Sequence, residues 1–146
     1  MLAGPNLPNQ LPKEIKGIPV NRKADALFFL HTARLSPRRN RDELKKGTKL
    51  EILRYVIHYA DGQEETVPVY VEQDVDDFKV KQPQPLPGAQ LAWTRPYEGT
   101  DYHAAVYAQQ WNNSRPGVEI VSFDMLPGTS NRGAVVLLAL TAATTQ

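Results

Sequence analysis

Twelve prolines and nine glycines are spread along the whole 146-residue chain, and this spacing is the strongest constraint on its fold. Proline breaks the interior of a helix, and both residue types mark turns. Between them lie short runs rich in β-branched and aromatic residues, which are typical of strands. The runs are residues 24–33, 49–60, 64–72, 101–111, 118–126 and 134–143. We therefore predict an all-β fold, an antiparallel β-sandwich of jelly-roll type.

Two of these runs, 24–33 and 134–143, are apolar on both faces of a strand. A strand with one wet face alternates, whereas a strand covered from both directions reads as a continuous apolar run. We therefore expect both runs to be central strands of the core.

The clearest turn signal is Asp61-Gly62 within "VIHYADGQEETVPV". These residues suit a two-residue type I′ turn, in which both central positions need a positive φ. That register pairs His58 with Glu65 across the hairpin. Pro68 has no N–H, so we expect it on an edge strand or at a position without a ladder hydrogen bond.

Composition excludes several classes of function. Hydrophobic residues make up 41% and charged residues 23%, the net charge is +1, and there is no cysteine. The charge balance gives no general field for nucleic acid or an anionic membrane, and the basic segment 34–46 is interrupted by acidic residues. Without cysteine there are no disulfides, thiolate nucleophiles or cysteine zinc sites. We expect no nucleic-acid partner and no membrane partner.

The length suits one domain, for which we predict residues 15–146. Residues 1–14 are rich in proline and asparagine and read as a linker or a truncated N-terminal segment. They have neither the basic head nor the apolar stretch of a signal peptide.

The three histidines, His31, His58 and His103, do not have the spacing of a metal motif such as HExxH. On strand alternation His31 shares a face with Leu27 and Phe29, so we interpret it as a hydrogen-bonded core histidine in preference to a catalytic or metal-binding one. His58 opposite Glu65 reads as a cross-strand pair.

One acidic cluster offers oxygen ligands of the kind that Ca²⁺ prefers. Its members are Glu72, Asp74, Asp76 and Asp77. The cluster lacks the glycine and the distal glutamate of an EF-hand loop, so a solvated acidic loop is the favoured interpretation. We expect no cofactor, with a structural Ca²⁺ as the alternative.

The segment 80–103, "VKQPQPLPGAQLAWTRPYEGTDYH", looks like a long proline-rich loop. Long loops in compact domains are often functional, and aromatic faces stack on flat apolar groups such as one face of a sugar ring. The loop combines aromatic with charged residues, and we predict a sugar site there. Its candidate residues are Trp93, Arg95, Tyr97, Glu98, Asp101 and Tyr102. Trp111, at a strand end, is a further ligand candidate, although the core interpretation is favoured for it.

Four stretches occur in an order that resembles a known module. They are "IPVNRKADALFFLHTA", "YVIHYADGQEETVPVYV", "WNNSRPGVEIVSFDM" and "VVLLALTA". Together they cover roughly residues 15–142 and resemble a β-sandwich accessory module of large exported bacterial glycoside hydrolases. That module is similar in architecture to the galactose-binding-like jelly rolls that many carbohydrate-binding modules share. The chain departs from the pattern at residues 112–117, "NNSRPG", where the module often has Asn-Pro.

The resemblance implies a non-catalytic carbohydrate-binding or accessory module that orients a polysaccharide-active enzyme. Its partners would be a polysaccharide or oligosaccharide and adjacent domains of the same polypeptide, and its location secreted, cell-surface or periplasmic. The alternative is a structural spacer that packs on a neighbouring catalytic domain and touches no sugar. We do not expect an enzyme, because the sequence has no GxSxG motif and no complete set of nucleophile, base and orienting residue. An exposed aromatic platform would favour sugar binding, and a bare apolar patch would favour the spacer.

Overall fold

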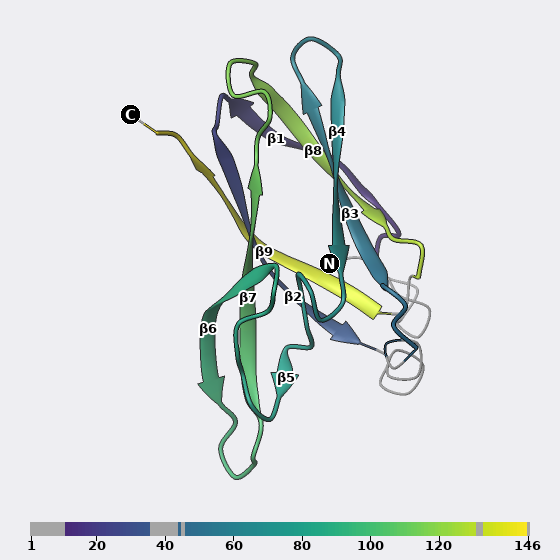
Figure 1. The fold of residues 1–146 in the computed structure, drawn as a ribbon, viewed down its shortest axis with the longest axis vertical. Coiled ribbons are helices and arrows are strands. Elements are labelled where there is room, and N and C mark those ends of the chain that lie inside the picture. Colours follow the sequence, from purple (N-terminus) through teal and green to yellow (C-terminus); the bar gives the residue numbers. More distant parts are fainter. Residues whose placement is uncertain (1–10, 36–43, 45, 131–132, 146) are drawn as a thin grey trace.

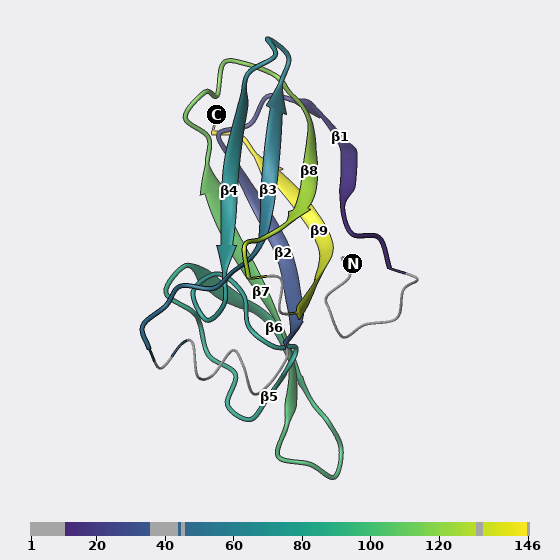
Figure 2. The ribbon, with the colours of Figure 1, turned by 90° about the vertical axis from the view of Figure 1, so that its right-hand side faces the viewer.

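The computed structural model describes residues 11–35, 44, 46–130 and 133–145, and its regular elements are nine strands in two antiparallel sheets (Figures 1 and 2). The first sheet has the order β1 (Ile15–Arg22), β8 (Ile120–Pro127), β3 (Glu51–Tyr59) and β4 (Glu64–Tyr70). The second has the order β5 (Lys79–Val80), β7 (His103–Asn112), β2 (Ala26–Leu35) and β9 (Gly133–Ala143), and β6 (Ala89–Pro96) also pairs with β7. The predicted all-β antiparallel sandwich is confirmed, and its jelly-roll type stays a prediction.

The core lies between the two sheets and has an aromatic centre. Phe29 on β2 stacks on Tyr55 of β3, with ring centroids 4.0 Å apart. Phe123 on β8 meets both rings edge-on at 6.0 Å. Such pairs add to the stabilisation that comes from burying their area, so they fix the central strands of the two sheets against each other. The run at 24–33 is thus a central strand, as predicted.

The second apolar run, 134–143, is not a central strand. It forms β9, which lies at the edge of its sheet and pairs only with β2 among the described strands. Ala134 and Val135 are buried, but Leu138 is 55% exposed and Ala139 is exposed. The prediction is wrong because an apolar run indicates only that side chains on both faces of the strand favour burial. It does not indicate whether the chain itself covers them.

The register of the β3–β4 hairpin differs by one residue from the prediction. His58 pairs with Glu64 and Ile57 with Glu65. The Tyr59 N–H donates to the Gln63 carbonyl at 2.9 Å, which closes a loop of three residues, 60–62. Gly62 holds a φ of 86° there. An Asp-Gly pair fits a three-residue loop with glycine in the left-handed position as well as a two-residue turn. Pro68 lies on β4, an edge strand, as expected.

Two predictions concern segments that are described only in part. Strand β1 begins at Ile15, where the predicted domain begins, and residues 1–10 of the predicted linker lie outside the described residues. Most of the basic segment 34–46 also lies outside them. Within the described ranges, no helix is long and apolar enough to cross a membrane.

Candidate functional site

Strand β7 carries a hairpin away from the sandwich (Figures 1 and 2). The end of β7 near Asn112 pairs with β2, whereas the end near His103 pairs with β5 on the same edge, and β6 follows the opposite edge. The projecting end is therefore a small three-stranded sheet with β7 at its centre. The turn between β6 and β7 is closed by the Tyr97 N–H, which donates to the Tyr102 carbonyl at 3.0 Å, and Gly99 has a φ of 74°.

A bulge in β6 decides which side chains share a face of this small sheet. Leu91 pairs with Tyr107 and Trp93 with Val106, so Ala92 is the extra residue. A bulge shifts the alternation by one residue. Leu91 consequently packs toward the buried cluster that contains Tyr107, and Trp93 turns to the opposite face.

Three aromatic side chains and a cation share this outer face. Arg95 lies two residues after Trp93 and pairs with Ala104. Tyr97 lies two residues after Arg95, and its N–H donates to the Tyr102 carbonyl. Residues at this spacing, and residues directly opposite each other, lie on one face. We call the set the hairpin face. It comprises Trp93, Arg95, Tyr97, Tyr102 and Ala104.

An open hollow of about 530 Å³ lies on the hairpin face. It is lined by Trp93, Arg95, Pro96, Tyr97, Glu98 and Ala104. Trp93 is 50% exposed, so about half of its side chain is open to a ligand. The hollow thus combines an aromatic surface with a cation and a carboxylate, which is the mixture expected of a site for a polyhydroxylated ligand.

The structure brings six of the seven predicted ligand residues to one end of the molecule. Arg95 and Trp93 lie on strand β6, not in an irregular loop as predicted, because the bulge hid the strand alternation. Glu98 and Asp101 lie in the turn that follows. Trp111 is the exception, because it is half-buried, pairs with Leu27 and packs against the main core.

Sequence reasoning missed two lysines at this end. The Lys79 Nζ lies 5.6 Å from the ring centroid of Tyr97 and 4.9 Å from that of Tyr102. The Lys81 Nζ lies 5.5 Å from the Tyr102 centroid. The one available signal was the spacing of the two lysines in "KVK", which places both on one face of a strand. Strand β5 is only two residues long, however, and it pairs with β7, which is distant in the sequence.

His31 is held entirely by protein atoms. It is fully buried, its Nδ1 lies 2.8 Å from the Tyr55 hydroxyl, and its Nε2 lies 2.9 Å from the Asp74 carbonyl. A carbonyl only accepts, so Nε2 carries the proton and the Tyr55 O–H donates to Nδ1. Burial lowers the pKa of His31 to about 4, which keeps the ring neutral. This geometry is that of the hydrogen-bonded core histidine expected from the sequence.

His58 pairs differently from the prediction. Its Nε2 lies 2.7 Å from a carboxylate oxygen of Asp124, and its Nδ1 lies 3.5 Å from Glu64. Glu65 instead accepts from the Ser114 hydroxyl, and its Oε2 lies 3.1 Å from the Tyr59 hydroxyl oxygen. The shifted hairpin register explains the exchange, because it places Glu64 opposite His58. The pKa of Asp124 is lowered despite its partial burial, because the His58 ring and the Gly17 N–H bond to it.

The acidic segment after β4 is tied to the backbone. Asp74 accepts from the Tyr70 N–H at 2.9 Å, and Asp77 accepts from the N–H groups of Leu35 and Lys79. Of its four carboxylates only Glu72 is exposed, whereas Asp74 is buried and Asp76 and Asp77 are half-buried, so the prediction of a solvated acidic loop is wrong. Burial raises the pKa of Asp74 and that of Asp76. The described residues contain no group of three or more histidine, cysteine or carboxylate side chains placed to hold a metal ion.

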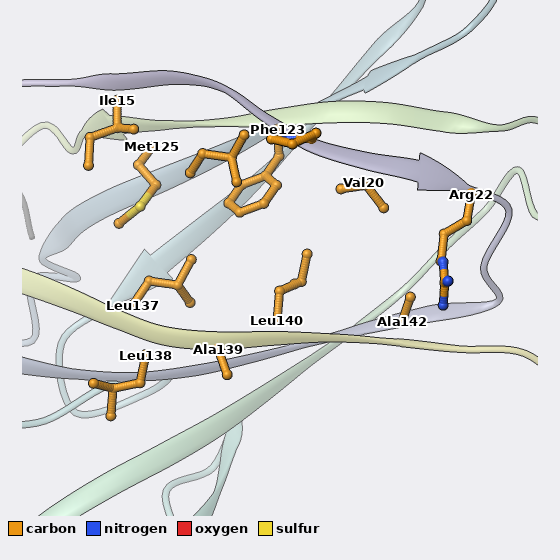
Figure 3. A pocket seen from close by; sticks show the side chains of 12 residues that line it. Ile15, Val20, Arg22, Phe123, Met125, Leu137, Leu138, Ala139, Leu140 and Ala142 are labelled. Carbon is orange, nitrogen blue, oxygen red and sulfur yellow. The ribbon is translucent and has the colours of Figure 1, made fainter.

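A second hollow, of about 500 Å³, opens between the edge strands of the two sheets (Figure 3). Side chains of β1 and β8 point across it toward those of β9. Its apolar lining includes Ile15, Val20, Phe123, Met125, Leu137 and Leu140. Arg22 is the one charged residue among the described residues that line it. We call this hollow the edge groove.

Comparisons with protein-family models, with curated proteins and with solved structures found no match to this chain. The candidate sites therefore stand on the geometry of the chain itself.

Proposed function

We propose that this chain is a non-catalytic carbohydrate-binding module that binds a polysaccharide or oligosaccharide on its hairpin face. The observation that carries the proposal is the hollow in which a half-exposed Trp93 lies beside Arg95, Tyr97 and Glu98. The apolar face of a sugar ring stacks on an aromatic ring, and its hydroxyls bond to charged groups at the rim. The resemblance of the sequence to an accessory module of exported glycoside hydrolases supports the same function. In that setting the module is secreted or displayed at the cell surface or in the periplasm, and it orients an attached enzyme on its substrate.

The strand setting of the site favours binding over a merely mobile loop. Trp93 and Arg95 are fixed by pairing with Val106 and Ala104 on β7. Pro96 restricts the backbone where β6 ends. Because these positions are set before a ligand arrives, less conformational entropy is lost on binding.

The test is retention of the purified chain on a panel of insoluble polysaccharides and soluble glycans. We expect binding that weakens by about 1–3 kcal/mol in each of Trp93→Ala, Tyr97→Ala and Tyr102→Ala, on the scale of base–aromatic stacking. Tyr70→Ala is the matched control, because Tyr70 also lies under a lysine, with the Lys49 Nζ 5.4 Å from its ring, but on β4. Each variant is first checked for folding by circular dichroism. Binding that all three variants retain would place the site elsewhere.

The edge groove favours a second candidate function, that of a spacer packed on a neighbouring domain of the same polypeptide. Its apolar lining and the exposed Leu138 form a surface of the kind that usually marks a protein contact. A folded chain that binds no glycan across the panel would support the spacer. The direct test is hydrogen exchange along β9, which a neighbouring domain seated on the groove would slow.

A further inference from the structure

Ala104 on β7 has a positively charged residue paired with it on each neighbouring strand, and we call these three residues the row at Ala104. Arg95 on β6 and Lys79 on β5 are both in register with Ala104 on β7. Residues directly paired in antiparallel strands extend on the same face. Ala104 contributes only a methyl group and lines the hollow together with Arg95. The row therefore forms a shallow surface with the small Ala104 at its centre and a positive group at each side.

The next row of the hairpin face is aromatic and also flanked by cations. Tyr97 and Tyr102 lie opposite each other, and the ammonium groups of Lys79 and Lys81 lie within 5.6 Å of their ring centroids. Both lysines are exposed. Attraction between an ammonium and a ring at an exposed site is weak, so either lysine can turn to the carboxylate of a sugar whose apolar face stacks on these rings.

Three cations lie on or beside the hairpin face. In the part of the chain that the structure describes, Lys79, Lys81 and Arg95 take part in none of the ion pairs. Of the nearby carboxylates, Glu98 lines the hollow from the turn, Asp101 lies in the same turn, and Asp77 accepts from the backbone N–H of Lys79. The row at Ala104 itself consists of Lys79, Ala104 and Arg95, so it carries two cations.

We propose that the hairpin face selects an acidic glycan whose uronate carboxylate lies over Ala104, between Arg95 and Lys79. The inference rests on the proposed carbohydrate-binding function and names its ligand class. The planar guanidinium of Arg95 matches a carboxylate, and Trp93 and the tyrosines offer stacking surfaces for adjacent sugar rings. Glu98 and Asp101 disfavour a nucleic acid strand, whose phosphates recur at every nucleotide and need a continuous positive groove.

The test compares polymers that differ only in charge. Polygalacturonate, alginate and hyaluronate are each titrated against their methyl esters by calorimetry at low salt. We expect at least one free acid to bind about five- to tenfold tighter than its ester, the effect of two exposed ion pairs. Added salt should reduce the difference. The double variant Lys79→Gln, Arg95→Gln should abolish it, whereas Lys49→Gln, which removes a lysine from another Tyr–Lys contact, should leave it unchanged.

The outcomes distinguish a failure of this inference from a failure of the proposed carbohydrate-binding function. Equal affinity for acids, esters and neutral glycans, or a preference that survives the double variant, would overturn the inference and leave the carbohydrate-binding function standing. Failure to bind any glycan in any form would overturn both. Binding to dextran sulfate or to oligothymidylate as tight as to the uronate polymers would indicate a general polyanion surface and would also overturn the inference.

Discussion

The two ends of the sandwich use aromatic and charged side chains differently (Figures 1 and 2). At the end formed by the β3–β4 turn and the β7–β8 connection, these side chains bond to one another. At the opposite end, the β6–β7 hairpin presents them to solvent. At the first end the Tyr59 O–H donates to Asn113 Oδ1 at 2.6 Å, and the Arg115 guanidinium lies 4.6 Å from the Tyr59 ring centroid. Burial and the nearby Glu65 raise the pKa of Tyr59 to about 12. At the other end Trp93 and Arg95 make no side-chain hydrogen bond among the described residues.

The difference separates two uses of the same residue types. Where the polar groups of aromatic and charged residues find partners inside the chain, those residues stabilise the fold. Where such residues lie on a paired strand and still remain exposed, their side chains are free to contact a ligand. The predictions below test whether the two ends divide in this way, beginning with the largest expected effect.

Asn113 is the centre of the bonded end, so its loss should cost the most. Its Oδ1 accepts from the Tyr59 O–H and from the Arg115 N–H, and its Nδ2 donates to the Ala24 carbonyl at 2.7 Å. Asn113→Ala removes these three bonds at a buried side chain and should lower the free energy of unfolding by about 2–4 kcal/mol, measured in urea. Asn112→Ala, at the exposed neighbouring position, should change it by less than about 0.5 kcal/mol. Equal losses would contradict the assignment.

The buried His31 should make stability depend on pH. Its pKa is about 4 in the folded chain, against an ordinary value of 6.5, so between these values the unfolded chain binds more protons. The stabilisation is therefore complete above pH 6.5 and is lost as the pH falls toward 4, by about 3 kcal/mol in total. Asp74 and Asp76, whose pKa values are raised by burial, act in the opposite direction.

The comparison of wild type with His31→Gln isolates the histidine from those carboxyl groups. The difference in unfolding free energy between the two proteins should shrink by about 3 kcal/mol between pH 7 and pH 4. Thermal or urea unfolding at a series of pH values measures it. A difference that stays constant with pH would show that the pKa of the ring is the same in the folded and the unfolded chain.

Much of the fold could be predicted because strand alternation and turn residues are local. The segments 24–33 and 49–60 match β2 and β3 closely, and the alternation around His31 gave its core-facing side. The hairpin register was beyond this reasoning, since Asp61-Gly62 fits loops of two or three residues equally well. The edge position of β9 was beyond it too, because apolar sequence does not reveal what covers a strand.

The candidate site could be located from the sequence but not assembled. Trp93, Tyr97 and Tyr102 stood out as aromatics in a proline-rich segment. The bulge at Ala92 masked the strand that orients them. The lysine at position 79 joins them only because β5 pairs with β7 across a long stretch of chain, and such non-local pairing leaves no pattern in a single sequence.

The two hairpin glycines allow the smallest and sharpest comparison of the ends. Gly62 and Gly99 have φ values of 86° and 74°, and a Cβ added at either would meet no atom within 4 Å. Alanine therefore brings the same local backbone cost at both, about 1 kcal/mol. At Gly62 the turn is tied down by the Asp61–Arg115 ion pair, so the full cost should appear in global unfolding. At Gly99 the projecting hairpin can open locally and relieve the strain, so the global loss should stay below about 0.5 kcal/mol.

Urea unfolding measures both losses, and faster hydrogen exchange of the Tyr97 N–H, which bonds the Tyr102 carbonyl, reports the local opening in Gly99→Ala. Equal global losses, with the Tyr97 amide still protected, would mean that the projecting hairpin is as firmly built into the sandwich as the bonded end.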